Sequence, residues 1–233
     1  MKRLSHRESH RSGRTSWLRA AVLGSNDAIV STSSLMLGVA ASAADNHTVL
    51  IAGVSGLAAG AMSMAVGEYV SVSSQRDAEE ADIAKEQHEL ETTPNAELKE
   101  LTGIYVQRGL DPALAAQVAE QLTAHDSLAA HLRDELGIEK GSMSRPLQAA
   151  WISAVSFAMF ALLPILALLV APARFRMETI AIATTVSLAI LGGLGGYLAG
   201  ASMRHAAVRV TVGGALAMAI VTGIGHLFGV AQG

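Results

Sequence analysis

The sequence contains no cysteine, few charged residues and none of the familiar nucleotide-binding motifs. The lack of cysteine excludes disulfides, thiolate metal sites and cysteine nucleophiles. Charged residues make up only 16% of the 233 residues and hydrophobic residues 51%, which is too apolar for an ordinary soluble domain. A Walker A loop, a dinucleotide-binding fingerprint and a G-x-S-x-G motif are all missing. An ATP-driven pump is therefore not indicated, and transport by this chain would have to use a gradient.

Five long apolar stretches predict an all-α membrane protein with five spans. A membrane helix needs roughly 20 mostly apolar residues, and each stretch is long enough. The apolar runs are continuous rather than alternating, which argues against an outer-membrane barrel. The predicted spans are residues 20–43, 49–72, 147–171, 178–201 and 207–230.

The positions of Lys and Arg predict the orientation, because cytoplasmic loops are enriched in these residues. Of the 17 Lys and Arg residues, 15 lie in three parts of the chain: the segments 1–19 and 76–145 and the turn at 202–209. The turn at 171–178 holds the other two. We therefore expect the N-terminus and the 76–145 segment in the cytoplasm and the C-terminus outside.

The spans and their connections divide the chain into four parts. Residues 1–19 form a basic cytoplasmic tail, 20–75 carry the first two spans, and 146–233 carry the last three. Residues 76–145 contain 15 acidic and 7 basic residues, so this inserted segment is the acidic part of the molecule. Its periodicity predicts a small helical domain, in which the helix from the second span continues to Pro94. A separate last helix is expected from about His125 to Leu136, ending at Gly137.

Two carboxylates and a thioether in the first two spans are candidates for a transport path. Ionisable groups inside a span cost roughly 2.5–3.5 kcal/mol on insertion scales and commonly face a water-filled path or a partner. Asp27 lies about one turn into the first span, where an interfacial carboxylate is the alternative interpretation. Met64 and Glu68 share a helix face in the second span, since they are four residues apart. A thioether beside carboxylates suits a borderline or soft cation, although a methionine alone is more often packing.

The acidic segment contains two pairs of glutamates that indicate a divalent-metal site. Glu86 and Glu89 are three residues apart, as are Glu97 and Glu100, so each pair lies on one side of its helix. Pro94 separates the pairs, and a turn there would bring the four carboxylates together. Clustered carboxylates bind cations such as Mn(II) or Fe(II), whereas a solvated acidic face is the alternative. Additional candidate ligands are Glu79 and Asp82 on the first face, and His131.

A zinc protease motif is missing, because His88-Glu89 is not followed by a second histidine at the required spacing. His88 also points away from the side that carries Glu86 and Glu89. No nucleophile or catalytic dyad stands out, so a secondary transporter is favoured over an enzyme. We expect no organic cofactor and no nucleic-acid partner.

Two span motifs make the chain resemble the vacuolar iron transporter family, in its bacterial branch. They are GSNDAIVSTSSLMLGVAA in the first span and AAGAMSMAVGEYVSVSSQRDAEEADI in the second. The stretches EQHE, AELKE and DELGIEK support the resemblance, which covers nearly the whole chain from about residue 18. It implies five membrane helices, a homodimer with the path between protomers, and a cytoplasmic metal-binding domain. It also implies proton-coupled export of Fe(II), with Mn(II) as an alternative substrate, here across a bacterial inner membrane.

The resemblance assigns roles to individual residues. Asp27 and Met64 match family positions in the path, and Glu135 matches a further ligand beside the glutamates 86, 89, 97 and 100. Gly56 stands where eukaryotic members have a glutamate, and Glu68 is the candidate replacement. His131 aligns with a family methionine and is a candidate substitute ligand, whereas the neighbouring Leu132 cannot coordinate a metal.

The sequence leaves two functional hypotheses. In the first, the chain is a homodimeric Fe(II) or Mn(II) exporter in contact with membrane lipid, in which a proton replaces the cation at Asp27. In the second, it is a membrane-anchored metal buffer or sensor that transports nothing. The second hypothesis gives no role to the carboxylates of Asp27 and Glu68 inside the spans.

Overall fold

The computed structural model describes residues 15–138 and 143–230, and every regular element in this part is helical. Residues 1–14 of the predicted tail, 1–19, therefore lie outside the described residues. The helices are α1 (Thr15–Ala41), α2 (Asn46–Thr92), α3 (Pro94–Gln107), α4 (Pro112–Asp134), α5 (Pro146–Val170), the short η2 (Ala173–Phe175), α6 (Arg176–Ala199) and α7 (Met203–Val230). The all-α class predicted from the sequence is confirmed.

Among the residues that the structure describes, four helical segments are long and apolar enough to cross a membrane, which confirms a membrane protein with several spans. They correspond to α2, α5, α6 with η2, and α7. The first predicted span, 20–43, falls mostly on α1, which is not in this group. Polar residues Ser25 to Asp27 and Ser31 to Ser34 reduce the hydropathy of α1. The count of five spans therefore stays a prediction.

The chain divides into two compact units, which we describe separately. The membrane unit comprises residues 1–69 and 147–233, and the inserted unit comprises residues 70–146. α2 runs through the boundary as one helix of 47 residues, as expected from a sequence with no Pro between Asn46 and Pro94. The inserted unit starts a few residues before the predicted boundary at 76.

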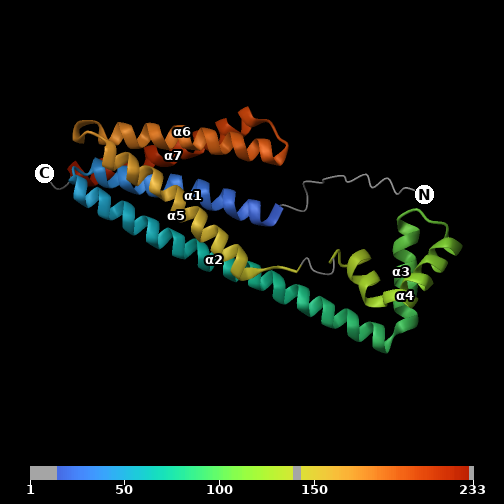
Figure 1. Ribbon diagram of the computed structural model, residues 1–233. Helices are drawn as coiled ribbons and strands as arrows, with labels where there is room; N and C mark the ends of the chain where they lie inside the picture. The colour runs from blue at the N-terminus through green and yellow to red at the C-terminus, as the bar shows by residue number, and fades with distance from the viewer. Residues whose placement is uncertain (1–14, 139–142, 231–233) are drawn as a thin grey trace, which may run out of the picture. The chain divides into compact units, whose positions relative to one another are not determined.

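In the membrane unit, α1 packs against both α6 and α7, and these two helices pack against each other (Figure 1). A buried cluster joins all five long helices of this unit; its members include Met36, Val49, Leu168, Ile180 and Met218. Close approach of α1 and α7 depends on glycine, because a Cβ built at Gly225 would lie 2.0 Å from the carbonyl oxygen of Gly38. The helices can approach because small residues leave no side chain between their backbones.

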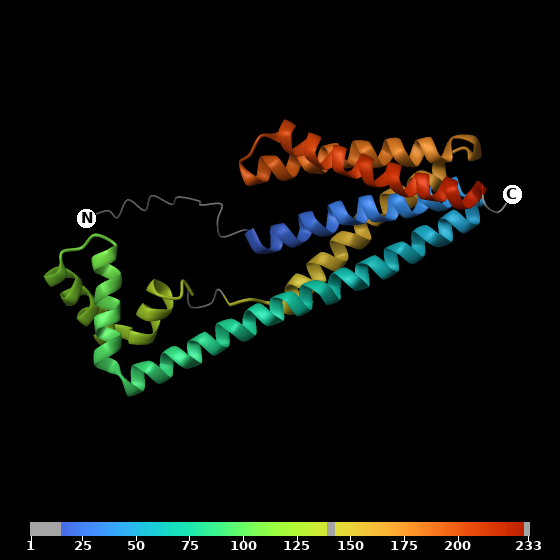
Figure 2. The same ribbon diagram turned by 180° about the vertical axis from the view of Figure 1, so that it is seen from behind.

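One end of the membrane unit gathers the α1–α2 turn, the α5–α6 connection and the end of α7 (Figure 2). The Arg176 guanidinium at the start of α6 donates to the carbonyl oxygen of Ala44 and to Oδ1 of Asn46, at 2.5 and 2.7 Å. Gly229 in α7 lies against the backbone of Ser42. These contacts place three chain segments at one end of the bundle, opposite the end where α2 continues into the inserted unit.

In the inserted unit, α3 packs against α4 around Leu101, Tyr105 and Ala115. α4 is interrupted at Asp126, where φ is −163° and ψ is 91°. The Asp126 carboxylate accepts a hydrogen bond from the backbone N–H of Ala129 at 3.0 Å, so it caps the helical segment that follows. The sequence predicted a separate last helix from about His125, and the break at Asp126 confirms it.

Candidate metal centre

The turn between α2 and α3 brings the two glutamate pairs onto neighbouring helices. α2 ends at Thr92, and the N–H of Thr93 still donates to the carbonyl of Glu89 at 2.7 Å. Pro94 then starts α3, because proline is well tolerated in the first turn of a helix. The Thr93 hydroxyl also lies 3.4 Å from Oε1 of Glu97, across the turn. The turn at Pro94 that the sequence suggested is therefore present.

The last segment of α4 brings an imidazole to these glutamates. His131 follows the Asp126 break by little more than one helical turn, and its side chain is fully buried. Its segment ends at Gly137, which has a φ of +67° that favours glycine. The N–H of Ile138 then donates to the carbonyl of Leu132 at 2.7 Å. The Asp126 break and the Gly137 end therefore define the short helix that presents His131.

Three buried side chains form the centre of the site. Glu86 from α2, Glu97 from α3 and His131 from α4 each offer a ligand atom, and these atoms lie within 4.8 Å of one another. Nδ1 of His131 is 2.9 Å from Oε1 of Glu86 and 3.2 Å from Oε2 of Glu135. The set of two buried carboxylates, one imidazole and a neighbouring carboxylate matches the ligands that Fe(II), Mn(II) and similar borderline cations accept.

Two buried atoms of these three side chains lack the hydrogen bonds that buried polar groups normally make. Oε1 of Glu86 and Nε2 of His131 have no hydrogen-bond partner among the residues that the structure describes. Oε1 of Glu86 is close to Nδ1 of His131, but the pair lacks hydrogen-bond geometry. Buried polar atoms without partners cost free energy, and a bound cation would supply the missing interaction to the Glu86 oxygen.

Electrostatic repulsion within the site also favours a cation. The pKa of Glu86 is raised by burial, and next by the negative charge of Glu135. The pKa of Glu100 is raised first by Glu135 and then by burial. Both shifts mean that the charged carboxylates are destabilised by their surroundings. A divalent cation would relieve the repulsion and the desolvation at once.

The remaining candidate ligands lie around this centre or away from it. Glu100 and Glu135 are more exposed than Glu86, and Glu89 pairs with Lys85 at 3.3 Å. The Glu79 carboxylate instead accepts two hydrogen bonds from Ser144, from its N–H at 3.0 Å and its hydroxyl at 2.8 Å. Asp82 is exposed. The structure therefore gathers Glu86, Glu97 and His131 closely and gives Glu79 a different partner.

Sequence reasoning missed Asp134, which holds α3 against α4 beside the site. Its carboxylate accepts hydrogen bonds from the Tyr105 hydroxyl at 2.6 Å, from Arg108 at 2.5 Å and from Arg133 at 2.5 Å. These bonds, that of Arg133 first, hold the pKa of Asp134 well below its usual range. Tyr105 and Arg108 are three residues apart, so both reach Asp134 from one face of α3. No sequence pattern pointed to their common partner.

In the membrane unit, the path candidates occupy adjoining levels of α1 and α2. Met64 is half-buried and packs against a cluster of Ala28, Phe157 and Ala161. Ala28 directly follows Asp27, so the two helices meet at the level of both path candidates. The Asp27 side chain itself is exposed on the surface of the single chain, and Glu68 is half-buried one turn beyond Met64.

The chain combines a bundle of membrane-length helices with an inserted unit, and the inserted unit holds a buried cluster of two carboxylates and an imidazole. These features define a membrane protein with a candidate divalent-metal site. Residues 18–226 match the model of the VIT family, and the chain belongs to this family. The resemblance seen in the sequence is thereby confirmed.

Several curated proteins are similar over nearly the whole chain. A protein of Acanthamoeba castellanii named vacuolar iron transporter is 49% identical, over 94% of this chain and 82% of the relative. Vacuolar iron transporter homolog 2 of Oryza sativa subsp. japonica is 37% identical over 92% of both chains. Vacuolar iron transporter homolog 2 of Arabidopsis thaliana is 36% identical over 94% of this chain and 87% of the relative.

Proposed function

We propose that this protein exports divalent iron, and manganese as an alternative, from the cytoplasm in exchange for protons. The observation that carries the proposal is the buried cluster of Glu86, Glu97 and His131, whose ligand atoms lie within 4.8 Å of one another. Membership of a family whose members include proteins named vacuolar iron transporters supports iron as the substrate. Metal ions are then the cargo, and the inserted unit collects them before transport.

In this proposal α1 also crosses the membrane, which brings the number of spans to five, and the protein works as a homodimer. The exposed residues Leu23, Asp27, Ser31 and Leu35 recur along one face of α1. A carboxylate and a hydroxyl on the outer face of a membrane helix would contact lipid at a high cost in free energy. A second copy that covers this face would remove the cost and line a path with Asp27, Met64 and Glu68 from both protomers.

Exchange of a metal ion for a proton has a simple physical basis at such a carboxylate. Charged carboxylate groups bind divalent cations, whereas a low-dielectric surrounding favours the protonated form once the cation has left. Asp27 would thus hold a cation in one part of the cycle and a proton in the other. The thioether of Met64 favours a borderline cation over Ca(II) or Mg(II).

The orientation follows from the same proposal. The basic N-terminus and the inserted unit lie in the cytoplasm of a bacterium, the C-terminus lies outside, and the inner (plasma) membrane is the location. Trp151 near the start of α5 and Tyr197 near the end of α6 are exposed. Both lie at the bundle end where α2 continues, so they fit an aromatic belt at the cytoplasmic interface.

Metal flux into proteoliposomes tests the function. Purified protein is reconstituted with an imposed proton gradient, and Fe(II), Mn(II) and Ca(II) are offered separately. We expect Fe(II) or Mn(II) flux that increases with the gradient, spares Ca(II) and is lost in Asp27→Ala and Met64→Ala, with the dimer intact. Met62→Leu, an exposed methionine on the same helix, is the matched control. Unchanged flux in the Asp27 or Met64 variant would overturn the proposed path.

A membrane-anchored metal buffer or sensor is the second candidate function. The favouring observation is that the buried cluster lies wholly within the inserted unit and includes no residue of the spans. Metal bound by the glutamate cluster, without flux of any cation in vesicles, would favour this alternative.

A further inference from the structure

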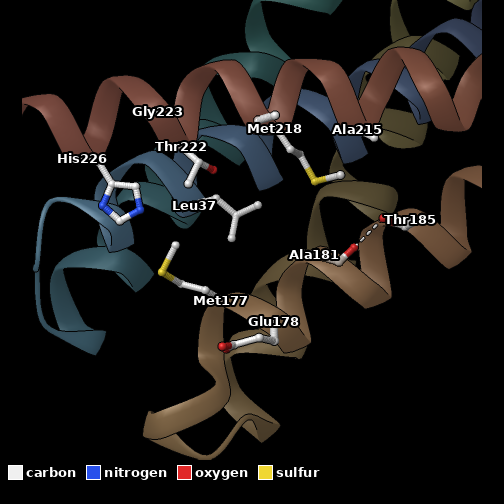
Figure 3. Close-up of a pocket in the computed structure, with 11 residues that line it drawn as sticks. Leu37, Met177, Glu178, Ala181, Thr185, Ala215, Met218, Thr222, Gly223 and His226 are labelled. Carbon is white, nitrogen blue, oxygen red and sulfur yellow. Dashed lines mark hydrogen bonds between the residues drawn. The ribbon is translucent and has the colours of Figure 1, made fainter.

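The two ends of the α6–α7 helix pair differ in charge. The end where α6 begins holds charges of both signs, Arg176 and Glu178, and Glu178 lines a pocket there together with His226 (Figure 3). At the opposite end, where α7 begins, Arg204 and Arg209 are both exposed. Glu178 is the last acidic residue of the chain, so neither helix offers a negative charge at the end that carries these two arginines.

Arg209 is unusual because it lies inside a membrane span. It belongs to the predicted span 207–230 and to the segment Met203–Gly229 that is long and apolar enough to cross a membrane. It follows the first residue of α7 by six positions, which is about 9 Å along the helix axis. Ionisable residues in a span usually pair with another group. Among the residues that the structure describes, Arg204 and Arg209 have no ion-pair partner.

The surrounding helices do not supply the missing negative charge. The start of α7 packs against the end of α6, where a Cβ built at Gly196 would lie 2.7 Å from that of Ala206. Residues 179–230 contain no Asp or Glu. In the described part of α1, Asp27 forms no ion pair with either arginine. The counter-charge of the two arginines must therefore come from outside these helices.

A stripe of exposed apolar residues on α7 shows what this face contacts. Residues four apart lie on one face of a helix, and such a series begins at Arg204. Its apolar members are 47–62% exposed in the single chain: Val208, Val212, Leu216, Ile220 and Ile224. In a membrane span, an exposed apolar face of this length is suited to acyl chains. The arginines thus lie at the end of a lipid-facing surface, at the level where acyl chains give way to headgroups.

The two guanidinium groups can reach a common anion at this level. The side chains of a helix lean toward its N-terminus, so Arg209 extends toward the start of α7, where Arg204 lies. The two Cα atoms are about 9 Å apart by helix geometry, which leaves room for one phosphate between the long side chains. Guanidinium groups bind phosphate oxygens through paired hydrogen bonds. The intervening His205 is engaged elsewhere, because its Nδ1 lies 2.9 Å from the hydroxyl of Ser202.

We propose that Arg204 and Arg209 bind the headgroup of an anionic phospholipid whose acyl chains lie along the apolar stripe of α7. The arginines supply the charge recognition, and the stripe that begins at Val208 supplies the contact with the acyl chains. The leaflet, the cytoplasmic one, rests on the proposed function, whereas the binding of the lipid does not.

Native mass spectrometry of the full-length protein in detergent tests this surface, because it reports the mass of each protein–lipid assembly. Phosphatidylglycerol and phosphatidylcholine with identical acyl chains are titrated separately. A basic residue near a membrane surface contributes about fivefold to the affinity for anionic lipid, so two should make phosphatidylglycerol bind about 25-fold more tightly than phosphatidylcholine. Equal affinities of the unaltered protein for the two lipids would overturn the proposal.

Variants assign the preference to these arginines. Arg209→Gln should bind phosphatidylglycerol about fivefold more weakly and phosphatidylcholine unchanged, whereas Arg209→Lys keeps the charge and should retain the preference. Arg174→Gln, an exposed arginine in η2 at the other end of the bundle, is the matched control. An equal loss in this control would show a general effect of charge and overturn the surface.

The same spectra distinguish the lipid from other occupants of the surface. Glycerol 3-phosphate carries the anionic group without acyl chains and should not displace phosphatidylglycerol when both are present at equal concentration. Displacement would indicate a site for soluble phosphates and would overturn the lipid as the ligand. Loss of a dimer in Arg209→Gln, with unchanged affinity for phosphatidylglycerol, would assign the arginine to a contact between copies and would also overturn the proposal.

Discussion

At the scale of single residues, the burial of His131 distinguishes it from the other histidines of the inserted unit. His88 and His125 are exposed, whereas His131 is fully buried between carboxylates of two other segments. A fully buried imidazole with an unpartnered ring nitrogen is costly without a ligand. The sequence offered His131 as an additional candidate ligand, and the family resemblance aligned it with a methionine, but only the packing of the inserted unit shows that it is buried.

Replacement of His131 should weaken metal binding in the inserted unit. We expect His131→Ala to reduce the affinity of the full-length protein for Co(II) at least about tenfold, since even loss of an outer partner of a metal ligand costs this much. Isothermal titration of Co(II) would measure the change. His88→Ala is the matched control, because His88 is exposed on the same unit. Equal affinities in the two variants would exclude His131 from the site.

Protons should compete with the metal at a higher pH than for ordinary glutamates. Because the pKa values of Glu86 and Glu100 are raised above the usual value of 4.5, these carboxylates begin to bind protons as the pH falls toward that raised range. Metal binding must displace those protons, so the affinity should fall as the pH is lowered and protons should be released on binding. The number of protons released on metal binding can be measured by calorimetry in buffers that differ in ionisation enthalpy. Glu100→Gln should release fewer protons, and an equal count would contradict the assignment.

At the scale of helices, the inserted unit depends on a few contacts that lock short elements together. Asp134 joins the end of α4 to Tyr105 and Arg108 of α3, while the Asp111 side chain caps the start of α4 by accepting from the N–H of Ala113. The cap was predictable, because an Asp-Pro pair before an apolar period is a known helix start. The contacts of Asp134 were not predictable, because Arg108 and Tyr105 lie 26 and 29 positions before it in the sequence.

Loss of the Asp134 charge should loosen α3 from α4. Asp134→Asn replaces hydrogen bonds to a charged group by weaker ones, and we expect a loss of about 1.5–3 kcal/mol in the stability of the inserted unit. Amide hydrogen exchange of α3 and α4 in the full-length protein should show the opening. Asp82→Asn, which changes an exposed carboxylate, should leave exchange unaltered. Unchanged protection in the Asp134 variant would show that the contacts do not hold the helices together.

Close packing of α1 and α7 should make one glycine intolerant of any side chain. A Cβ at Gly225 would lie 2.0 Å from the backbone of Gly38, so Gly225→Ala must force the two helices apart. We expect a clear fall in the thermal stability of the detergent-solubilised protein. Gly213→Ala on the same helix is the matched control, because no described atom lies within 4 Å of a Cβ there. A variant at Gly225 as stable as the control would contradict this packing.

At the scale of the whole molecule, the orientation predicts which segments an external reagent can reach. The chain contains no cysteine, so single cysteines can be introduced without a background. Asn95→Cys lies in the inserted unit and Ala173→Cys in the short η2 helix, and both positions are exposed. A membrane-impermeant maleimide added to intact cells should label Ala173→Cys alone, and should label Asn95→Cys only after the cells are opened. The reverse pattern would invert the orientation.

Local patterns in the sequence determined the helical class, the uninterrupted α2 and the break near Asp126, because helix period, capping and proline act within a few residues. The family motifs likewise identified the VIT family from the sequence alone. Only tertiary packing decided which carboxylates lie together: Glu86 and Glu97 meet His131, whereas Glu79 binds Ser144. Three helices from distant parts of the inserted unit form that cluster, and side-chain spacing along one helix carries no information about its neighbours.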